Sequence, residues 1–333
     1  MAAVVALVVG LGASLVEIPY LAISPGSAVE VGPLVEVTGG PNFAPEGEIY
    51  LVTVRLAQVT LVGALRGWLD PSVEVVARGR IVPPDLMVEE LRDINLAQME
   101  GSKRQALGVA FEELGYDAIS GTGAEVVQVE VGSPAGGALV AGDTIVGLDE
   151  AAVTTHHDVV ETLGQRPPGA RVDLVVDPPG AGEQRTVALT LAASVDDPGI
   201  PFLGATLGTR QPRFELPFDV DIASEHIGGP SAGLAFTLEV LDVLTEGELT
   251  GGQRVAATGT VELDGSVGVV GGVVQKTAAA VEEGVQLFLV PLEEAAEARR
   301  RAGDDVVVEG VDSLAGALRA LADHGGEPLI PPP

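Results

Sequence analysis

Two segments of the sequence place a hydroxyl group and an amine where they could act as nucleophile and base. Ser231 stands in a run of small residues, GGPSAG, after the strand-like FDVDIA and before an apolar stretch with leucines at helical spacing. The backbone at Gly229, Pro230 and Ala232 would then lie at a helix start, where free N–H groups and the helix dipole favour a developing oxyanion. An ordinary N-cap serine fits the same position, so chemistry is one of two interpretations.

Lys276 is one of only two lysines among the 18 basic residues, the other being Lys103. It follows Gly271-Gly272 by four residues and is flanked by valines and alanines, so we expect an apolar environment on a helix. Arginine is effectively always protonated, whereas a buried lysine can lose its proton. A lysine left by chance in an arginine-rich chain is the alternative. Burial shifts a lysine pKa by about 3–5 units, enough to make Lys276 a base near neutral pH.

A Ser–His–Asp triad is the competing chemistry, with His226 and Asp221 close to Ser231 in sequence. The four histidines are too scattered for a zinc motif and the chain has no cysteine, so we expect neither a metal nor a cofactor. The formal net charge of −30 argues against nucleic-acid binding, which needs a basic surface.

The serine and lysine segments together resemble the proteolytic domain of the Lon family. That family carries G-P-S-A-G around the serine, and its lysine follows a Gly-Gly pair by four residues, as both do here. Thr258-Gly259 resembles the family's T-G, and QLFLVP (286–291) resembles the strand after the lysine helix. The resemblance implies a Ser231–Lys276 dyad with Thr258 in support, and it assigns the base to Lys276 rather than to His226. One departure is Ile227-Gly228, where Lon enzymes usually carry Lys-Asp.

A second resemblance, to PDZ domains, covers about 70 residues. It is carried by Gly132-Ser133-Pro134-Ala135, by AGDTI (141–145), by a predicted helix from His156 to Leu163, and by Pro168-Gly169 before a strand. It implies binding of extended peptides or C-termini at a sheet edge. We expect His156 and His157 to be solvated at the helix start.

The N-terminal residues 1–16 carry no charged side chain. They would span about 24 Å as a helix, and we interpret them as part of a signal anchor ending near residue 23. No basic residue precedes the run and no good cleavage site follows it. A buried strand or helix is the alternative. An anchor would make this a single-pass protein of the cell membrane with its other domains extracytoplasmic.

The predicted fold class is α+β, with a Lon-type proteolytic domain of mixed sheets and packed helices, a β-barrel-like PDZ domain and the anchor helix. The whole layout resembles bacterial membrane-anchored proteins with PDZ and Lon-like domains. Because GEIYLVTVRL and the helix after it resemble the opening of the Lon proteolytic fold, we expect the PDZ domain to interrupt the peptidase domain. The predicted boundaries are 1–23 anchor, 24–119 N-terminal peptidase part, 120–195 PDZ domain, 196–324 Lon-like domain and 325–333 disordered tail.

The function predicted from these features is an ATP-independent serine endopeptidase acting on unfolded, exported or membrane polypeptides recruited by the PDZ domain. Neither lysine follows a glycine, so the chain has no Walker A motif. By analogy with Lon-like rings we expect a homo-oligomer. The alternative is a non-catalytic PDZ scaffold or chaperone-like binding protein on a Lon-like fold.

Overall fold

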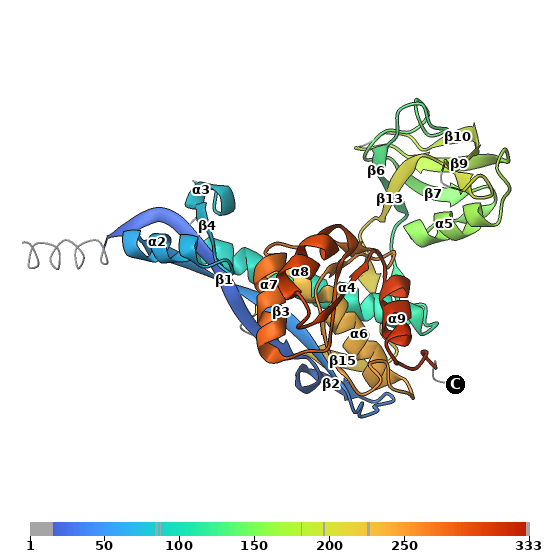
Figure 1. Ribbon diagram of the computed structural model, residues 1–333. Coiled ribbons are helices and arrows are strands. Elements are labelled where there is room, and N and C mark those ends of the chain that lie inside the picture. The colour runs from blue at the N-terminus through green and yellow to red at the C-terminus, as the bar shows by residue number, and fades with distance from the viewer. Residues whose placement is uncertain are drawn as a thin grey trace, which may run out of the picture. The chain divides into compact units, whose positions relative to one another are not determined.

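The structure is a computed structural model that describes residues 16–83, 86, 88–180, 182–195, 197–224 and 227–330. The chain forms two compact units (Figure 1). Unit 1 contains two separate chain segments, one up to Gly115 and one from Phe218 onward, and unit 2 is the continuous segment Tyr116–Pro217. Each unit contains both helices and strands, in agreement with the predicted α+β class.

Unit 1 is organised by a mixed sheet with the strand order β20-β19-β16-β3-β1-β4. The strands β20, β19, β16 and β3 run parallel, and β1 and β4 add on antiparallel. Their bounds are β1 Glu17–Glu30, β3 Glu48–Thr60, β4 Glu74–Ala77, β16 Arg254–Ala257, β19 Leu287–Pro291 and β20 Val307–Val311. The predicted strands GEIYLVTVRL and QLFLVP are therefore confirmed as β3 and β19.

Helices cover both faces of the parallel part of this sheet, which explains why the central residues of its strands, 49–52, 255–257 and 287–290, are apolar and buried. On one face, α7 (Val273–Glu283) and α8 (Ala295–Ala302) enclose a core that includes Val52, Phe288 and Val290. On the other, α6 (Gly233–Leu244) contacts β3 and β16, and α4 (Val88–Glu113) packs against α6.

The remaining elements of unit 1 are short, apart from α2 and α9. They are η1 Gly32–Leu34, β2 Val35–Thr38, α2 Leu61–Leu69, α3 Arg78–Ile81, β15 Asp219–Ile222, η2 Pro230–Ala232, β17 Thr260–Val261, β18 Val267–Gly268, η3 Leu292–Glu294 and α9 Leu314–Asp323. The helix predicted after GEIYLVTVRL is confirmed as α2, and the Thr60 side chain caps its start by accepting a hydrogen bond from Gly63 N–H (3.2 Å). Strand β15 pairs with β2 and leads toward Ser231.

Unit 2 is an antiparallel sheet with the order β10-β9-β7-β6-β13, on which β13 is an edge strand. A single longer helix, α5 (His156–Gly164), contacts β6 and β13 and begins with a Thr155/Asp158 capping box. The strands are β5 Ile119–Ser120, β6 Ala124–Val129, β7 Thr144–Leu148, β8 Ala151–Ala152, β9 Arg171–Asp177, β10 Arg185–Thr190, β11 Ala192–Ala193, β12 Pro201–Phe202, β13 Ala205–Thr209 and β14 Arg213–Phe214.

The compact unit that contains the PDZ-like sheet continues past the predicted boundary at 195, to Pro217. The Asp-Pro-Gly segment that suggested a linker is the turn between β11 and β12, where Gly199 N–H donates to Asp197 Oδ1 (2.8 Å). Strand β13 then pairs with β6 of the same unit. A turn and a linker share the same residue types, so sequence alone did not separate them.

The predicted anchor falls largely on residues 1–15, which lie outside the described residues. Residues 17–23, placed in the anchor by the sequence, form instead the start of β1, because their backbone pairs with β3 and, from Tyr20, with β4. In the part of the chain that the structure describes, no helix is both long and apolar enough to cross a membrane.

Residues 325–330, which the sequence placed in the predicted disordered tail, make backbone contacts with unit 1. Glu327 N–H donates to Glu248 O (2.8 Å), and Ile330 forms a β-bridge with Glu246. These backbone contacts hold the segment against the loop after α6, although its proline content suggested otherwise. Residues 331–333 lie outside the described residues.

Candidate active site

Ser231 lies in the short helix η2 that leads directly into α6. Its side chain is half-buried, and no hydrogen bond to another described residue engages its hydroxyl. Gly229 adopts a φ of 96°, a conformation that favours glycine, and Pro230 supplies the fixed φ suited to a first helical turn. The sequence GGPSAG therefore turns the chain sharply from β15 into α6 and holds the serine at the helix start.

Helix α4, which lies far away in sequence, anchors this turn. Gly229 N–H donates to Asn95 O (2.9 Å), and Ser102 Oγ donates to Pro230 O (3.0 Å). A Cβ atom at Gly228 would come within 3.0 Å of Asn95 Cβ. The close approach of α4 thus accounts for glycine at 228, where the Lon pattern has a larger residue.

These contacts revise the predicted oxyanion groups. Gly229 N–H is already bonded to Asn95, and Pro230 has no N–H to donate. Of the three predicted backbone groups, only that of Ala232 has an N–H that is not bonded to α4, and the N–H of Ser231 lies next to it at the start of η2. Asn95 and Ser102 were missed from the sequence. The one available signal was a small polar residue, Ser102, on the apolar face of α4 with Met99 and Ala106.

Lys276 lies on the first turns of α7 and is almost completely buried, with 3% of its surface exposed. Its helix starts at Gly272, which has a left-handed backbone (φ 73°, ψ 39°). A Cβ atom there would lie 2.8 Å from Val54 Cγ1, so glycine at 272 lets α7 begin close against β3. The predicted apolar environment of Lys276 is confirmed, since Val273, Ala279 and Ala280 are buried around it.

Thr258 connects the lysine to the serine segment. Lys276 Nζ donates to Thr258 Oγ1 (3.1 Å), and Thr258 Oγ1 donates to Ser231 O (3.1 Å). Gly259 N–H donates to the same carbonyl of Ser231 (2.9 Å). The two residues singled out by sequence are therefore joined through one buried threonine, while among the described contacts no hydrogen bond links their own side chains directly.

Burial sets the protonation of Lys276. Loss of hydration lowers its pKa to about 8, and the negative charge of Glu294 partly opposes that shift. Glu294 follows β19 in η3, and its carboxylate accepts a hydrogen bond from Val270 N–H (2.9 Å). Burial raises the pKa of Glu294. Glu294 was not identified from the sequence, because it comes from a segment after the lysine helix with no motif of its own.

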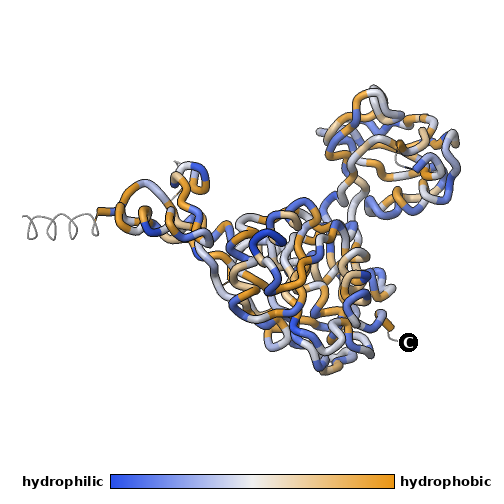
Figure 2. The backbone as a smooth tube through the Cα atoms, in the orientation of Figure 1, coloured by the Kyte–Doolittle hydropathy of each residue, from blue (hydrophilic) through white to orange (hydrophobic). Residues whose placement is uncertain are grey.

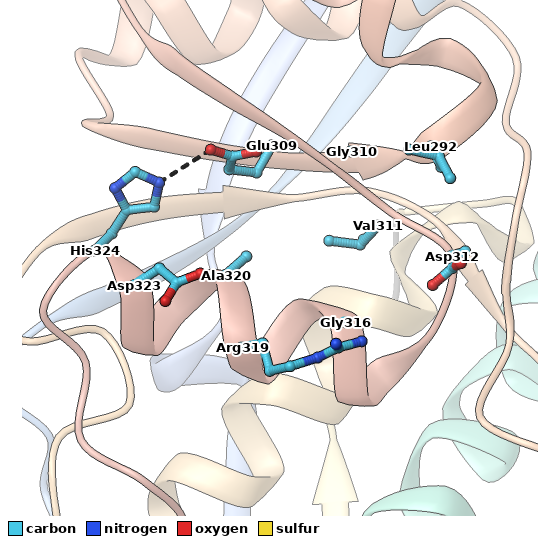
Figure 3. A pocket seen from close by; sticks show the side chains of 10 residues that line it. All are labelled: Leu292, Glu309, Gly310, Val311, Asp312, Gly316, Arg319, Ala320, Asp323 and His324. Carbon is cyan, nitrogen blue, oxygen red and sulfur yellow. Dashed lines mark hydrogen bonds and ion pairs between the residues drawn. The ribbon is translucent and has the colours of Figure 1, made fainter.

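Of the two competing triad residues, the structure describes only Asp221. Asp221 is an exposed residue of β15, and His226 lies outside the described residues. Among described residues, no cluster of acidic or histidine side chains is suited to a metal ion. A pocket between β20 and α9, lined by Glu309, Arg319 and His324, contains none of the candidate residues (Figure 3).

Comparison with known proteins gives a match for each unit. Residues 223–306 match the model of the Lon protease (S16) C-terminal proteolytic domain, and residues 105–189 match the PDZ domain model. The chain carries a Lon-type proteolytic domain and a PDZ domain. The Lon-type match includes Ser231, Thr258 and Lys276 and supports a serine peptidase.

Several solved structures are similar to about a quarter of the chain. The PDZ domain of an SdrC-like protein from Listeria monocytogenes is 26% identical and covers 26% of this chain and 87% of its own, with a TM-score of 0.24. The solution structure of GtR34C from Geobacillus thermodenitrificans is 28% identical, with coverage of 26% and 95% and a TM-score of 0.23. No curated protein matches the chain.

The PDZ domain places its helix beside the edge strand. His156, expected to be solvated, is buried (6% exposed), and its Nδ1 lies 2.7 Å from Thr209 Oγ1 at the end of β13. That part of the prediction is wrong, because α5 packs close to β13. His157 is exposed, as expected.

Proposed function

We propose that the chain is a serine endopeptidase in which Ser231 is the nucleophile and Lys276 its general base. The observation that carries this proposal is the buried amine of Lys276, hydrogen-bonded to Thr258, which in turn is bonded to the backbone of Ser231. A buried lysine with a pKa near 8 is neutral in a useful fraction of molecules at neutral pH. The Lon-type match supports the same assignment.

In the proposed reaction, Ser231 Oγ attacks a peptide carbonyl while its proton passes to Lys276 Nζ. The tetrahedral oxyanion is stabilised by N–H groups at the start of η2 and α6, those of Ser231 and Ala232. Lys276 then gives its proton to the leaving amine, and an acyl-enzyme forms. Water, deprotonated by the same lysine, hydrolyses the ester and restores Ser231. Thr258 positions the amine and does not react.

The PDZ domain supports recruitment of peptide substrates. Its edge strand β13 offers unpaired backbone groups beside α5, the arrangement in which an extended peptide adds a strand. We infer that flexible, unfolded segments are the substrates, because the chain carries no Walker A motif with which to drive unfolding. The uncharged residues 1–16 support a single-pass membrane tether with both domains extracytoplasmic. A homo-oligomer stays a prediction.

The test is cleavage of casein, a flexible protein, by the full chain and two single variants. Ser231→Ala and Lys276→Ala should each lower kcat/KM by a factor of about 100 or more. Lys103→Ala is the matched control: it removes the other lysine, which pairs with Glu100 on α4, and should leave cleavage unchanged. Full activity in either dyad variant would overturn the assignment. Absent cleavage together with peptide binding would favour the PDZ scaffold instead.

A further inference from the structure

The helix α2 has its large apolar residues on the outside. Its small residues, Gly63, Ala64 and Gly67, face the body of unit 1, and a Cβ atom at Gly67 would lie 2.7 Å from Val75 Cγ2. Four large side chains of the same helix are exposed: Leu61 55%, Leu65 58%, Trp68 64% and Leu69 79%. Such a contiguous set on one helix marks an interaction surface, since exposed apolar residues are otherwise scattered.

This α2 face, defined by Leu61, Leu65, Trp68 and Leu69, lies at one end of unit 1 with β4 and α3 (Figure 1), and Figure 2 colours much of the backbone at this end as hydrophobic. The uncharged N-terminal run arrives at the same place, because Leu61 N–H donates to Val16 O (3.4 Å).

The net charge at this end of unit 1 is opposite in sign to the net charge of the whole chain. Segment 55–81 carries four arginines and only two carboxylates, a local charge of +2 in a chain of −30. No ion pair to a described residue occupies any of these arginines. They are Arg55, Arg66, Arg78 and Arg80. A partner for this end therefore has to accept apolar side chains and also offer negative charge.

We propose that the α2 face lies in the interfacial layer of an anionic lipid bilayer. Leucines and a tryptophan on one helix face, next to arginines, are the side chains that partition into this layer and meet lipid phosphates. A second copy of the chain fits less well, because a two-fold contact would set the same arginines against one another. The uncharged residues 1–15 would cover the apolar side chains but leave the arginines without a counter-charge.

This surface deepens the proposed membrane attachment and is independent of peptidase activity. It adds a second contact, which would fix the end of unit 1 at the bilayer beside the tether. Trp68 is the only tryptophan of the chain, so its fluorescence reports on this face alone.

The experiment follows Trp68 emission of the full-length Ser231→Ala chain mixed with vesicles of phosphatidylcholine, with or without phosphatidylglycerol. We expect a shift to shorter wavelength and protection from acrylamide quenching with the anionic vesicles, weakening as salt rises. Leu65→Glu with Leu69→Glu should abolish both effects. Val131→Glu with Val195→Glu is the matched control, since it charges two fully exposed apolar residues of unit 2.

Three outcomes would overturn the proposal. If the chain co-sedimented with vesicles while acrylamide still quenched Trp68 fully, the chain would bind the membrane through the N-terminal tether and not through the α2 face. Emission already shifted without vesicles and independent of protein concentration would show that the chain covers its own α2 face. The same shift growing with protein concentration would show self-association. None of these results bears on Ser231 or Lys276, whose test is cleavage.

Discussion

Lys276 Nζ lies 3.1 Å from Thr258 Oγ1, inside unit 1 and shielded from solvent. Because Thr258 also bonds the carbonyl of Ser231, one side chain fixes the amine relative to the serine turn. Thr258 is fully buried, so its hydroxyl has no water to replace these partners. The predictions that follow start from this relationship.

Thr258→Val should remove both hydrogen bonds while keeping the side-chain shape. We expect kcat to fall about 10- to 100-fold, because the amine loses its positioning partner. Thr258→Ser keeps the hydroxyl and should retain most of the activity. The measurement is kcat and KM of casein cleavage, and equal activity of the Val and Ser variants would contradict the positioning role.

The kcat/KM of casein cleavage should rise with pH, with a midpoint near the Lys276 pKa of about 8. The base acts only when neutral, so the rate should fall about tenfold for each pH unit below that midpoint. A flat profile between pH 6 and 9 would speak against Lys276 as the base; these limits span about one to two units around the midpoint.

Glu294→Gln should move this midpoint to lower pH. The charge of Glu294 raises the pKa of Lys276, and its removal leaves burial unopposed. Glutamine can still accept the hydrogen bond from Val270 N–H. Glu293→Gln, an exposed neighbour, serves as control and should leave the midpoint in place. A shift of equal size in both variants would show that only the general surface charge matters.

Gly272→Ala should destabilise the fold and reduce activity, whereas Gly271→Ala should change little. Alanine at 272 would need φ near +73° and would press its Cβ against Val54, at a cost of about 1–3 kcal/mol. At 271 a Cβ meets no atom within 4 Å. Urea unfolding of both variants measures the difference, and equal stability would show that the start of α7 adapts.

Two buried carboxyl groups of α6 should make the protein less stable at high pH. Burial raises the pKa of Glu239 to about 8 and of Asp242 to about 7. The folded state then holds protons that the unfolded chain releases near pH 4–5, so the free energy of unfolding falls as pH rises toward 8.

Glu239→Gln should therefore gain stability relative to the parent at pH 9, on the order of a few kcal/mol, and gain little at pH 4. Thermal unfolding at both values measures this. Glu246→Gln, at an exposed position, removes the same charge and should show no such pH trend. If both substitutions changed stability equally, the charge of the whole protein, and not burial of Glu239, would set how the free energy of unfolding varies with pH.

Individual helices, strands and turns could be predicted from the sequence. The extent of unit 2 and the contacts of the C-terminal segment could not, because they depend on residues far apart in the chain. Strands β3 and β19, helices α2 and α6 and the glycine turns before Ser231 and Lys276 follow from short-range pattern, because each depends on residues within a few positions. The sequence does not show that unit 2 continues past residue 195, since Asp197 and Gly199 form a turn whose second strand lies beyond them. The contacts of residues 325–330 could not be predicted either, because their partners lie on a loop about 80 residues earlier in the chain.

The sequence by itself determined which side chains carry the proposed chemistry. Ser231 and Lys276 were named from residue type and from the spacing of glycines around them, which is a local property, and Thr258 was named from the resemblance of Thr258-Gly259 to the T-G pair of the Lon family. The tertiary structure decided what those residues contact: Thr258 reaches the serine carbonyl across 27 positions, and Asn95 and Ser102 of α4 reach the serine turn across more than a hundred. It also decided that α2 turns its leucines and Trp68 outward, because the space under the helix admits only glycine and alanine.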